Sequence, residues 1–186
     1  IPADSEGLRT DLLEQELARL ESQGRLSRVK LIYLVSYYEN PSGVSLSEQR
    51  RAEVVEIARR WSRQQRILIL EDAAYRELRY DGPVYSSVYQ TDDSREHVLY
   101  TQTFSKSFSP GVRVGNVMAP PDLLDAIRDR KGNEDFGSGN LSQHLLEHVL
   151  RTGIYHAHLE TVRQAYRLKR DAMLTAARDY FEEIPG

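Results

Sequence analysis

The chain alternates short, continuous apolar runs with longer segments in which apolar residues recur every three or four positions. The continuous runs are of strand type. The first, 30–36, is too continuous for a strand with one exposed face, so we expect it to be buried and covered on both faces. A turn signal at Pro110-Gly111 predicts that the chain reverses between the last two runs. The predicted strands are residues 30–36, 67–70, 98–103 and 112–119.

The segments between and after these runs have a helical period. Ser45-Leu46-Ser47-Glu48 has the spacing of a capping box, which predicts a helix that starts there and ends near Arg63. The stretch 132–140, rich in Gly, Asn and Ser, is expected to be a flexible connector. Strands that alternate with helices predict an α/β fold with a mostly parallel sheet and helices on both faces, in three layers. The other predicted helices are 8–21, 120–131, 141–151 and 154–181.

Polar residues follow three of the predicted strands. Asn40 comes after the run 30–36, Asp72 after 67–70 and Lys106 after 98–103. Open parallel sheets bind ligands outside the carboxyl ends of their strands, so we expect these three residues to converge on one rim. Lys106 stands among small hydroxyl residues, and Arg113 follows it by seven positions. An amine, hydroxyls and a fixed guanidinium suit a phosphorylated carbonyl cofactor.

The stretch 103–116 resembles the cofactor-lysine segment of the fold-type I pyridoxal-phosphate enzymes, the class I and II aminotransferases. Two further family motifs stand upstream in the family's order, Asn40-Pro41-Ser42-Gly43 and Asp72-Ala73-Ala74-Tyr75. The resemblance runs through nearly the whole chain and implies the large domain of that fold. This sequence departs mildly from the family at Ser42, where threonine is commoner, and at Thr103, where serine is commoner.

The resemblance implies a catalytic or cofactor-binding role for four residues. Lys106 would form a Schiff base with pyridoxal 5'-phosphate and later move a proton. Asp72 would keep the pyridine nitrogen of the cofactor protonated. Tyr75 and Asn40 would hydrogen-bond the ring hydroxylate. The plainer alternatives are a solvated surface lysine, a helix-capping or turn aspartate, and an Asn-Pro turn.

Phosphate binding is the implied role of three more residues. A planar guanidinium fork suits a phosphate dianion better than a point charge does, so Arg113 would bind it, with Thr103 and Ser105 as hydroxyl donors. The alternative for Arg113 is a surface or salt-bridging arginine. No metal site is expected, because His144 and His148 lie four apart on a predicted helix without a carboxylate or cysteine pattern to complete one.

Composition narrows the classes of partner. The chain has 186 residues, of which 40% are hydrophobic and 28% charged, with a net charge of −3 and no cysteine. This balance implies neither nucleic acid nor an acidic surface as a partner. No apolar run approaches membrane-spanning length, so no membrane partner is expected. The lack of cysteine excludes disulfides and thiol catalysis and fits a reducing cytosol, so we expect a cytoplasmic protein.

The resemblance also implies that the chain is incomplete. Residues 1–152 correspond to the central part of the cofactor-binding large domain, and residues 153–186 to a long helix that leads towards a small C-terminal domain. The family's N-terminal segment, and the small domain with its carboxylate-binding arginine, are not found. The start at Ile1-Pro2 rather than Met agrees with this expectation.

Three functions remain open from the sequence. The first is an aminotransferase that moves an amino group from an amino acid to a 2-oxo acid, as a homodimer in the full-length protein. The second is another pyridoxal-phosphate reaction, by a lyase or synthase, because the motifs serve the cofactor. The third is the aminotransferase-like sensor domain of a transcription regulator, although this segment carries no helix-turn-helix with a basic face.

Overall fold

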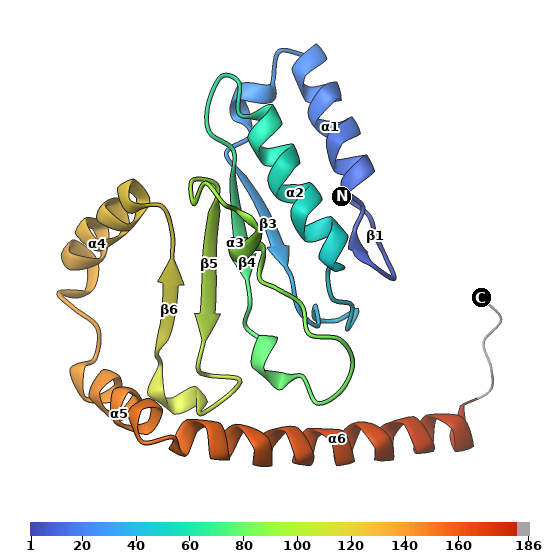
Figure 1. Ribbon diagram of the computed structural model, residues 1–186, viewed down its shortest axis with the longest axis vertical. Coiled ribbons are helices and arrows are strands. Elements are labelled where there is room, and N and C mark those ends of the chain that lie inside the picture. The colour runs from blue at the N-terminus through green and yellow to red at the C-terminus, as the bar shows by residue number, and fades with distance from the viewer. Residues whose placement is uncertain (182–186) are drawn as a thin grey trace.

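The computed structural model describes residues 1–181. Four strands form one sheet in the order β3-β4-β5-β6 (Figure 1). β4 pairs in parallel with both β3 and β5, whereas β6 returns antiparallel to β5. The mostly parallel α/β fold and the chain reversal before the last strand are therefore confirmed. The strands are β3 Leu31–Val35, β4 Leu68–Asp72, β5 Val98–Thr103 and β6 Gly115–Met118.

All five predicted helices are present. A short hairpin of β1 (Ala3–Asp4) and β2 (Gly7–Leu8) precedes the first of them. Of the segment 153–186, which was predicted as a long helix, residues 154–180 form one helix, and residues 182–186 lie outside the described part of the chain. The helices are α1 Thr10–Ser22, α2 Glu48–Trp61, α3 Val88–Thr91, α4 Pro121–Asp135, α5 Asn140–Arg151 and α6 Ile154–Tyr180, with 3₁₀ turns at Leu26–Arg28, Arg76–Leu78 and Pro110–Val112.

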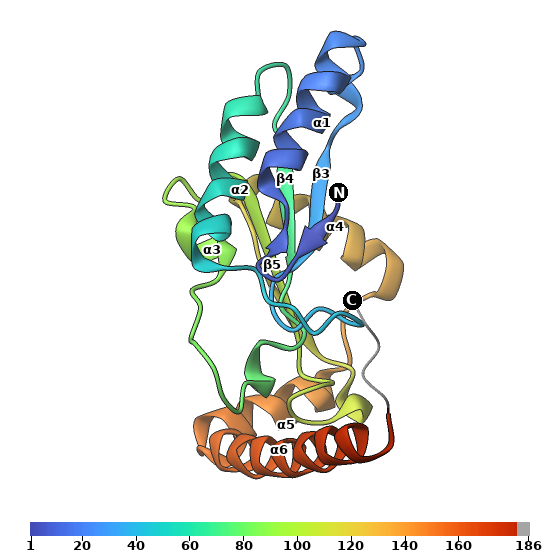
Figure 2. The same ribbon diagram turned by 90° about the vertical axis from the view of Figure 1, so that its right-hand side faces the viewer.

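The main core lies on one face of the sheet. Alternate strand residues, among them Ile32, Ile69 and Val98, pack against apolar residues of α1 and α2. α1, α2 and the short α3 cover this face, while α4 lies toward the opposite side, beyond β6 (Figures 1 and 2). Helices therefore flank the sheet on both sides, as expected for an α/β fold.

The second face of β3 is bare in the described chain. Ile32 and Leu34 are buried beneath the helices, but Leu31 and Tyr33 are 46% and 58% exposed. The expectation that this run is covered on both faces is therefore wrong for residues 1–181. Side chains alternate between the faces of a strand, and a continuous apolar run shows only that both faces are apolar, not that both are covered.

The start of α2 differs from the prediction. Its N-cap is Ser47 rather than Ser45, and the Ser47 hydroxyl accepts a hydrogen bond from the backbone N–H of Arg50. The hydroxyl of Ser45 instead accepts the backbone N–H of Tyr38, at 3.0 Å. Ser45 therefore stabilises the turn that precedes α2 and does not cap the helix.

The predicted connector after α4 is shorter than expected, because the helix continues to Asp135. Two ion pairs at a spacing of four residues, Arg130–Glu134 and Lys131–Asp135, support this last part. The real connector is residues 136–139. The glycine content of 132–140 therefore did not predict where the helix ends, because an isolated glycine weakens a helix by only about 1 kcal/mol.

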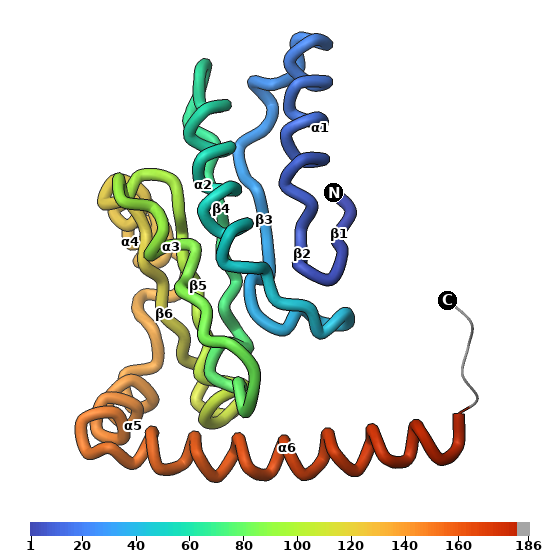
Figure 3. Tube along the Cα trace, turned by 45° about the vertical axis from the view of Figure 1, so that its right-hand side comes forward, coloured from blue at the N-terminus to red at the C-terminus, as the bar shows by residue number. Residues whose placement is uncertain are grey.

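α6 lies beneath the carboxyl ends of the parallel strands (Figures 1 and 3). Arg163 of α6 donates from Nε to the backbone carbonyl of Glu77, at 2.8 Å, and also pairs with the Glu77 carboxylate. At the start of the helix the Tyr155 hydroxyl donates to Ser107 Oγ, at 2.9 Å. α6 is thus attached to the loops that follow both β4 and β5. Within residues 1–181, neither this helix nor another is long and apolar enough to cross a membrane.

Candidate functional site

Most of the candidate residues gather where the parallel strands end. Asp72 and Thr103 are the last residues of β4 and β5, and Tyr75 and Lys106 each follow three residues later. The chain then turns through Pro110–Val112 and returns as β6. Lys106 therefore lies in a loop whose two ends are fixed in adjacent strands.

The carboxylate of Asp72 accepts hydrogen bonds on both of its oxygens. Oδ1 accepts the backbone N–H of Ala74, at 3.0 Å, and Oδ2 accepts the hydroxyl of Tyr33, at 2.9 Å. Partial burial and the hydrogen bond to Asp72 raise the pKa of Tyr33, so its phenol is a donor at neutral pH. The bond to Ala74 is the turn-forming contact that the plainer interpretation of Asp72 predicts. The bond from Tyr33 is additional to it.

Lys106 and Tyr75 meet across the rim. The Lys106 ammonium lies over the Tyr75 ring, with Nζ 6.0 Å from the ring centroid. Tyr75 is half-buried at the start of the 3₁₀ turn Arg76–Leu78, while the Lys106 side chain is exposed. The structure therefore brings together residues from the second and third sequence motifs, which are 31 positions apart.

Arg113, Ser105 and Thr103 form a connected polar group next to Lys106. Arg113 donates to Ser105 Oγ at 3.5 Å and to the Pro110 carbonyl at 3.2 Å, and Thr103 Oγ1 accepts the backbone N–H of Ser105 at 3.1 Å. Arg113 has a left-handed backbone, with φ of 53° and ψ of 36°. Non-glycine residues seldom adopt that conformation, and those that do are enriched at ligand sites.

Asn40 is not joined to the other candidates. It is exposed in the turn after β3, where Gly43, with φ of 73°, donates its N–H to the Glu39 carbonyl. Ser42 Oγ donates to the Glu39 carboxylate at 2.9 Å. Within residues 1–181 no hydrogen bond links the Asn40 side chain to another candidate. The contacts of this motif are therefore those of a turn.

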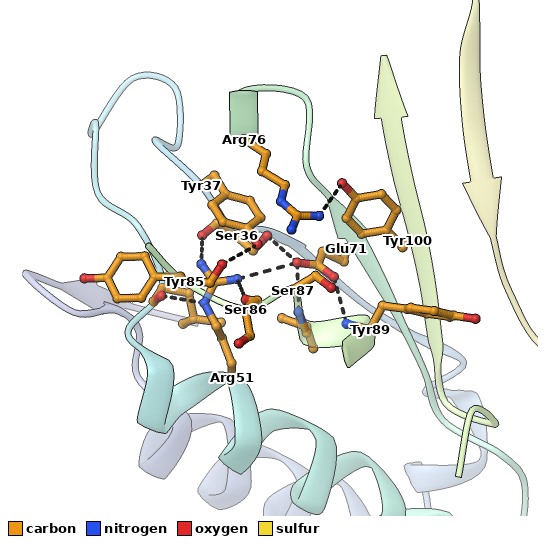
Figure 4. A network of polar contacts seen from close by, with 12 residues as sticks. Ser36, Tyr37, Arg51, Glu71, Arg76, Tyr85, Ser86, Ser87, Tyr89 and Tyr100 are labelled. Atoms are coloured by element: carbon orange, nitrogen blue, oxygen red, sulfur yellow. Dashed lines mark hydrogen bonds and ion pairs between the residues drawn. The ribbon is translucent and has the colours of Figure 1, made fainter. Parts of the chain in front are cut away.

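A buried ionic network behind the rim was not predicted (Figure 4). Arg51 of α2 and Glu71 of β4 approach to 3.6 Å, and neither side chain has exposed surface. Glu71 also accepts three hydrogen bonds: Oε1 accepts the Ser36 hydroxyl at 2.6 Å and the Val88 N–H at 3.0 Å, and Oε2 accepts the Tyr89 N–H at 3.0 Å. The network therefore connects α2, β4, the start of α3 and Ser36, the residue that follows β3.

Two aromatic rings enclose the guanidinium of Arg51. Its central carbon lies 4.3 Å from the ring centroid of Tyr37 and 5.1 Å from that of Tyr85. Burial lowers the pKa of Arg51, and burial raises the pKa of Tyr37 to about 12 despite the nearby guanidinium. The sequence signal for this network is a glutamate within a buried strand, but the pattern does not show which cation neutralises it.

Glu71 and Asp72 are consecutive and serve opposite faces of β4. Glu71 contacts the helix-covered face, whereas Asp72 contacts Tyr33 on the bare face. Tyr33 was not recognised as a site residue. It belongs to a continuous apolar run, and only the pairing of β3 with β4 brings its hydroxyl to Asp72.

Four of the five histidines lie in α5 and α6. His144, His148 and His156 are exposed, whereas His158 is partly buried and its ring meets that of Phe108 edge-on, with the ring centroids 5.5 Å apart. His144 lies 3.4 Å from the carboxylate of Glu147 on the same helix.

Comparisons with known proteins place this geometry in a family. The family model "Aminotransferase class I and II" matches residues 2–183. The chain is 33% identical over 183 residues to aromatic-amino-acid aminotransferase 1 of Thermococcus litoralis, covering 98% of this chain and 42% of that protein. It is 34% identical over 185 residues to the HTH-type transcriptional regulator YdfD of Bacillus subtilis, covering 99% of this chain and 36% of that protein.

A solved structure agrees with these matches. The kynurenine aminotransferase of Pyrococcus horikoshii, solved in complex with PMP, has a TM-score of 0.92 at 32% identity, over 98% of this chain and 44% of that one. The chain thus spans less than half the length of each of these proteins. Since the family model covers nearly the entire chain, we conclude that the chain belongs to the class I and II aminotransferase family.

Proposed function

We propose that the protein carrying this chain is a pyridoxal-phosphate-dependent aminotransferase, which transfers an amino group from an amino acid to a 2-oxo acid. Family membership supports the cofactor, and a solved relative is in complex with PMP. The observation that carries the proposal is the Lys106 amine over the ring of Tyr75, in a loop next to the strand end that holds Asp72.

The residues at the rim fit the functional groups of pyridoxal phosphate. They offer an amine for the aldehyde, an oriented carboxylate for the pyridine nitrogen, a phenol for the ring hydroxyl, and a guanidinium with hydroxyls for the phosphate. When bound, this cofactor supplies an electrophilic carbonyl carbon and a ring that accepts electrons. The amine, carboxylate, phenol and guanidinium belong to Lys106, Asp72, Tyr75 and Arg113.

Lys106 and Asp72 would perform the chemistry. Lys106 would anchor the cofactor through its amine and, once the substrate amine replaces it, carry a proton from the substrate α-carbon. The ionised Asp72 would hold a proton on the pyridine nitrogen, because an anion within hydrogen-bonding distance favours the charged form of a base. The two bonds that Asp72 accepts orient its carboxylate for this task.

The remaining candidates would bind and orient. Arg113, Ser105 and Thr103 would bind the phosphate, with the planar guanidinium making paired hydrogen bonds to its oxygens. Tyr75 would donate its phenolic hydrogen to the ring hydroxylate. Asn40 would reach the same oxygen from the turn after β3.

The same proposal extends to the architecture. Residues 1–152 would form the central part of a cofactor-binding domain, and α6 would lead towards a small domain. The support is that the matched relatives are more than twice as long as this chain. We also propose that the full-length protein acts as a homodimer.

A second candidate function is favoured by one comparison. The identity to the regulator YdfD, 34%, is as high as the identity to the aminotransferase, 33%. A regulator of this kind would use the same residues to sense the cofactor without turning over an amino acid. A lyase or synthase would also use them, so only the reaction products separate the three functions.

The cofactor assignment is tested by borohydride reduction. The full-length protein that carries this sequence is mixed with pyridoxal phosphate and reduced, and its peptides are mapped by mass spectrometry. We expect a pyridoxyl group on Lys106. Lys106→Ala should lose the visible absorbance of the bound cofactor, while Lys131→Ala, an exposed lysine of α4, should keep it. A folded protein that leaves Lys106 unmodified would overturn the assignment.

The reaction is tested on a panel of amino acids without added 2-oxo acid. An aminotransferase converts its bound cofactor to the amine form and releases one equivalent of the matching 2-oxo acid, which mass spectrometry detects. Cofactor that stays on Lys106 with every amino acid would favour the regulator. Release of any other product would favour a lyase or synthase.

A further inference from the structure

The hydroxyl of Tyr33 reaches Asp72 from the neighbouring strand. The parallel register of β3 and β4 pairs Tyr33 with Leu70 and Val35 with Asp72, so Tyr33 and Asp72 lie diagonally on one face of the sheet. The hydroxyl donates to Asp72 Oδ2 at 2.9 Å. The two groups belong to different strands, so the contact forms only when the sheet has this register.

The bond from Tyr33 restricts the Asp72 carboxylate in a way that the backbone does not. The terminal torsion of an aspartate is broad and roughly two-fold, so one hydrogen bond leaves the carboxylate plane free to rotate. The Ala74 N–H holds Oδ1, and the Tyr33 hydroxyl holds Oδ2. Two donors on different oxygens fix that plane, and each oxygen keeps a lone pair for a further partner.

We propose that Tyr33 is a positioning residue of the cofactor site, which acts through Asp72 to keep the pyridine nitrogen of bound pyridoxal phosphate protonated. This inference rests on the function proposed above. Tyr33 itself would touch neither the cofactor nor the substrate.

The exposure of Tyr33 makes the assignment testable without damage to the core. Its side chain is 58% exposed on the bare face of β3, so Tyr33→Phe removes one oxygen and opens no internal cavity. The matched control is Tyr166→Phe, which removes a phenol that is 44% exposed on α6. Both variants should remain folded.

The experiment compares the cofactor affinity of the parent protein and both variants, in the full-length protein that carries this sequence. Because Tyr33→Phe leaves the Asp72 carboxylate with one orienting hydrogen bond instead of two, we expect this variant to bind pyridoxal phosphate about tenfold more weakly. Tyr166→Phe should leave the affinity unchanged. With a carbocyclic analogue, in which C–H replaces the ring nitrogen, the parent and Tyr33→Phe should bind equally.

A spectroscopic measurement separates positioning from a general loss of affinity. The chemical shift of an isotopically labelled pyridine nitrogen reports its protonation. In Tyr33→Phe at saturating cofactor it should move toward the unprotonated value, and in Tyr166→Phe it should not move.

Two outcomes would overturn the assignment on different grounds. A parent protein that binds cofactor, with a Tyr33→Phe variant of equal affinity and unchanged nitrogen shift, overturns the role of Tyr33 alone. A parent protein that binds no cofactor overturns the proposed function, and the role of Tyr33 with it. An equal loss of affinity for the carbocyclic analogue would also reject the role, because the effect would not pass through the ring nitrogen.

Discussion

Arg51 and Glu71 form an ion pair at 3.6 Å in which neither side chain is reached by solvent. Charges removed from water are costly unless each has a partner, and here every oxygen of Glu71 is occupied. Glu71 immediately precedes Asp72, at the strand end that carries the candidate site. The buried pair therefore anchors the end of β4 on which Asp72 lies.

The first prediction concerns the loss of this charge pair. Glu71→Gln keeps the shape of the side chain but leaves the Arg51 guanidinium buried without an anion. Removing one partner of a buried pair costs about 3–5 kcal/mol, so we expect the free energy of unfolding to fall by that amount in urea denaturation. Glu16→Gln is the control, because the Glu16–Arg19 pair is exposed and surface pairs contribute about 0–1 kcal/mol. Equal effects of the two substitutions would contradict the prediction.

The second prediction concerns Tyr37 at alkaline pH. Its buried phenol has a pKa of about 12 in the folded protein, whereas a tyrosine in an unfolded chain titrates near 10. The fold therefore binds the phenolic proton more tightly. The resulting stability is fully present below about pH 10 and is lost as the pH rises from there through 12.

The measurement for Tyr37 is the near-ultraviolet absorbance of phenolate. Subtracting the absorbance titration curve of Tyr37→Phe from that of the parent protein isolates the signal of Tyr37. This difference curve should have its midpoint near pH 12. A Tyr37 difference curve centred near 10 would show that the phenol is not buried as described.

The third prediction concerns the attachment of α6 to the loop that carries Lys106. Tyr155 and Ser107 are 5% and 1% exposed, and their hydroxyls are bonded to each other. Tyr155→Phe and Ser107→Ala should each destabilise the protein by about 1–2 kcal/mol, and the double variant by less than their sum. Thermal or urea unfolding measures all three. In the control, Tyr155→Phe with Ser94→Ala should be additive, and additivity in the first pair would refute the coupling.

The fourth prediction concerns two glycines. A Cβ on Gly115 would lie 2.8 Å from the Gln102 carbonyl oxygen on the paired strand, too close for either backbone to remain in place. Gly115→Ala should therefore cost about 1–3 kcal/mol of stability. Gly132→Ala, in α4 with nothing within 4 Å of the new methyl group, should gain about 0.5–1 kcal/mol. Stabilisation by both substitutions would indicate that β5 and β6 are not paired this closely.

The sequence predicted well those features that depend on neighbours along the chain. The periods of the apolar positions identified four strands and five helices, and the positions of Asp72 and Lys106 at strand ends follow directly from them. The same local evidence misassigned the cap of α2, because the capping-box spacing fits Ser45 with Glu48, whereas the residue three positions after Ser47 is Arg50. Only the backbone partner, Tyr38 for one and Arg50 for the other, decides between them.

The features that sequence reasoning missed depend on pairing between distant segments. Tyr33 is 39 positions from Asp72, and Arg51 is 20 positions from Glu71. Neither relationship has a local pattern, because a tyrosine in an apolar strand and an arginine in a charged helix are both ordinary. The bare face of β3 was missed for a related reason, since apolar character does not say what covers it.

Glu71 and Asp72 contact opposite faces of β4, and together they favour one alignment of this strand against β3. A shift of β4 by one residue against β3 would turn every side chain to the other face. A shift in one direction would put Asp72, with its shorter side chain, on the face of Arg51, and a shift in the other direction would put Glu71 at the strand end that Asp72 now occupies. Either shift would therefore break the present contacts of both carboxylates. The two adjacent acids thus favour this register of the sheet over both neighbouring ones.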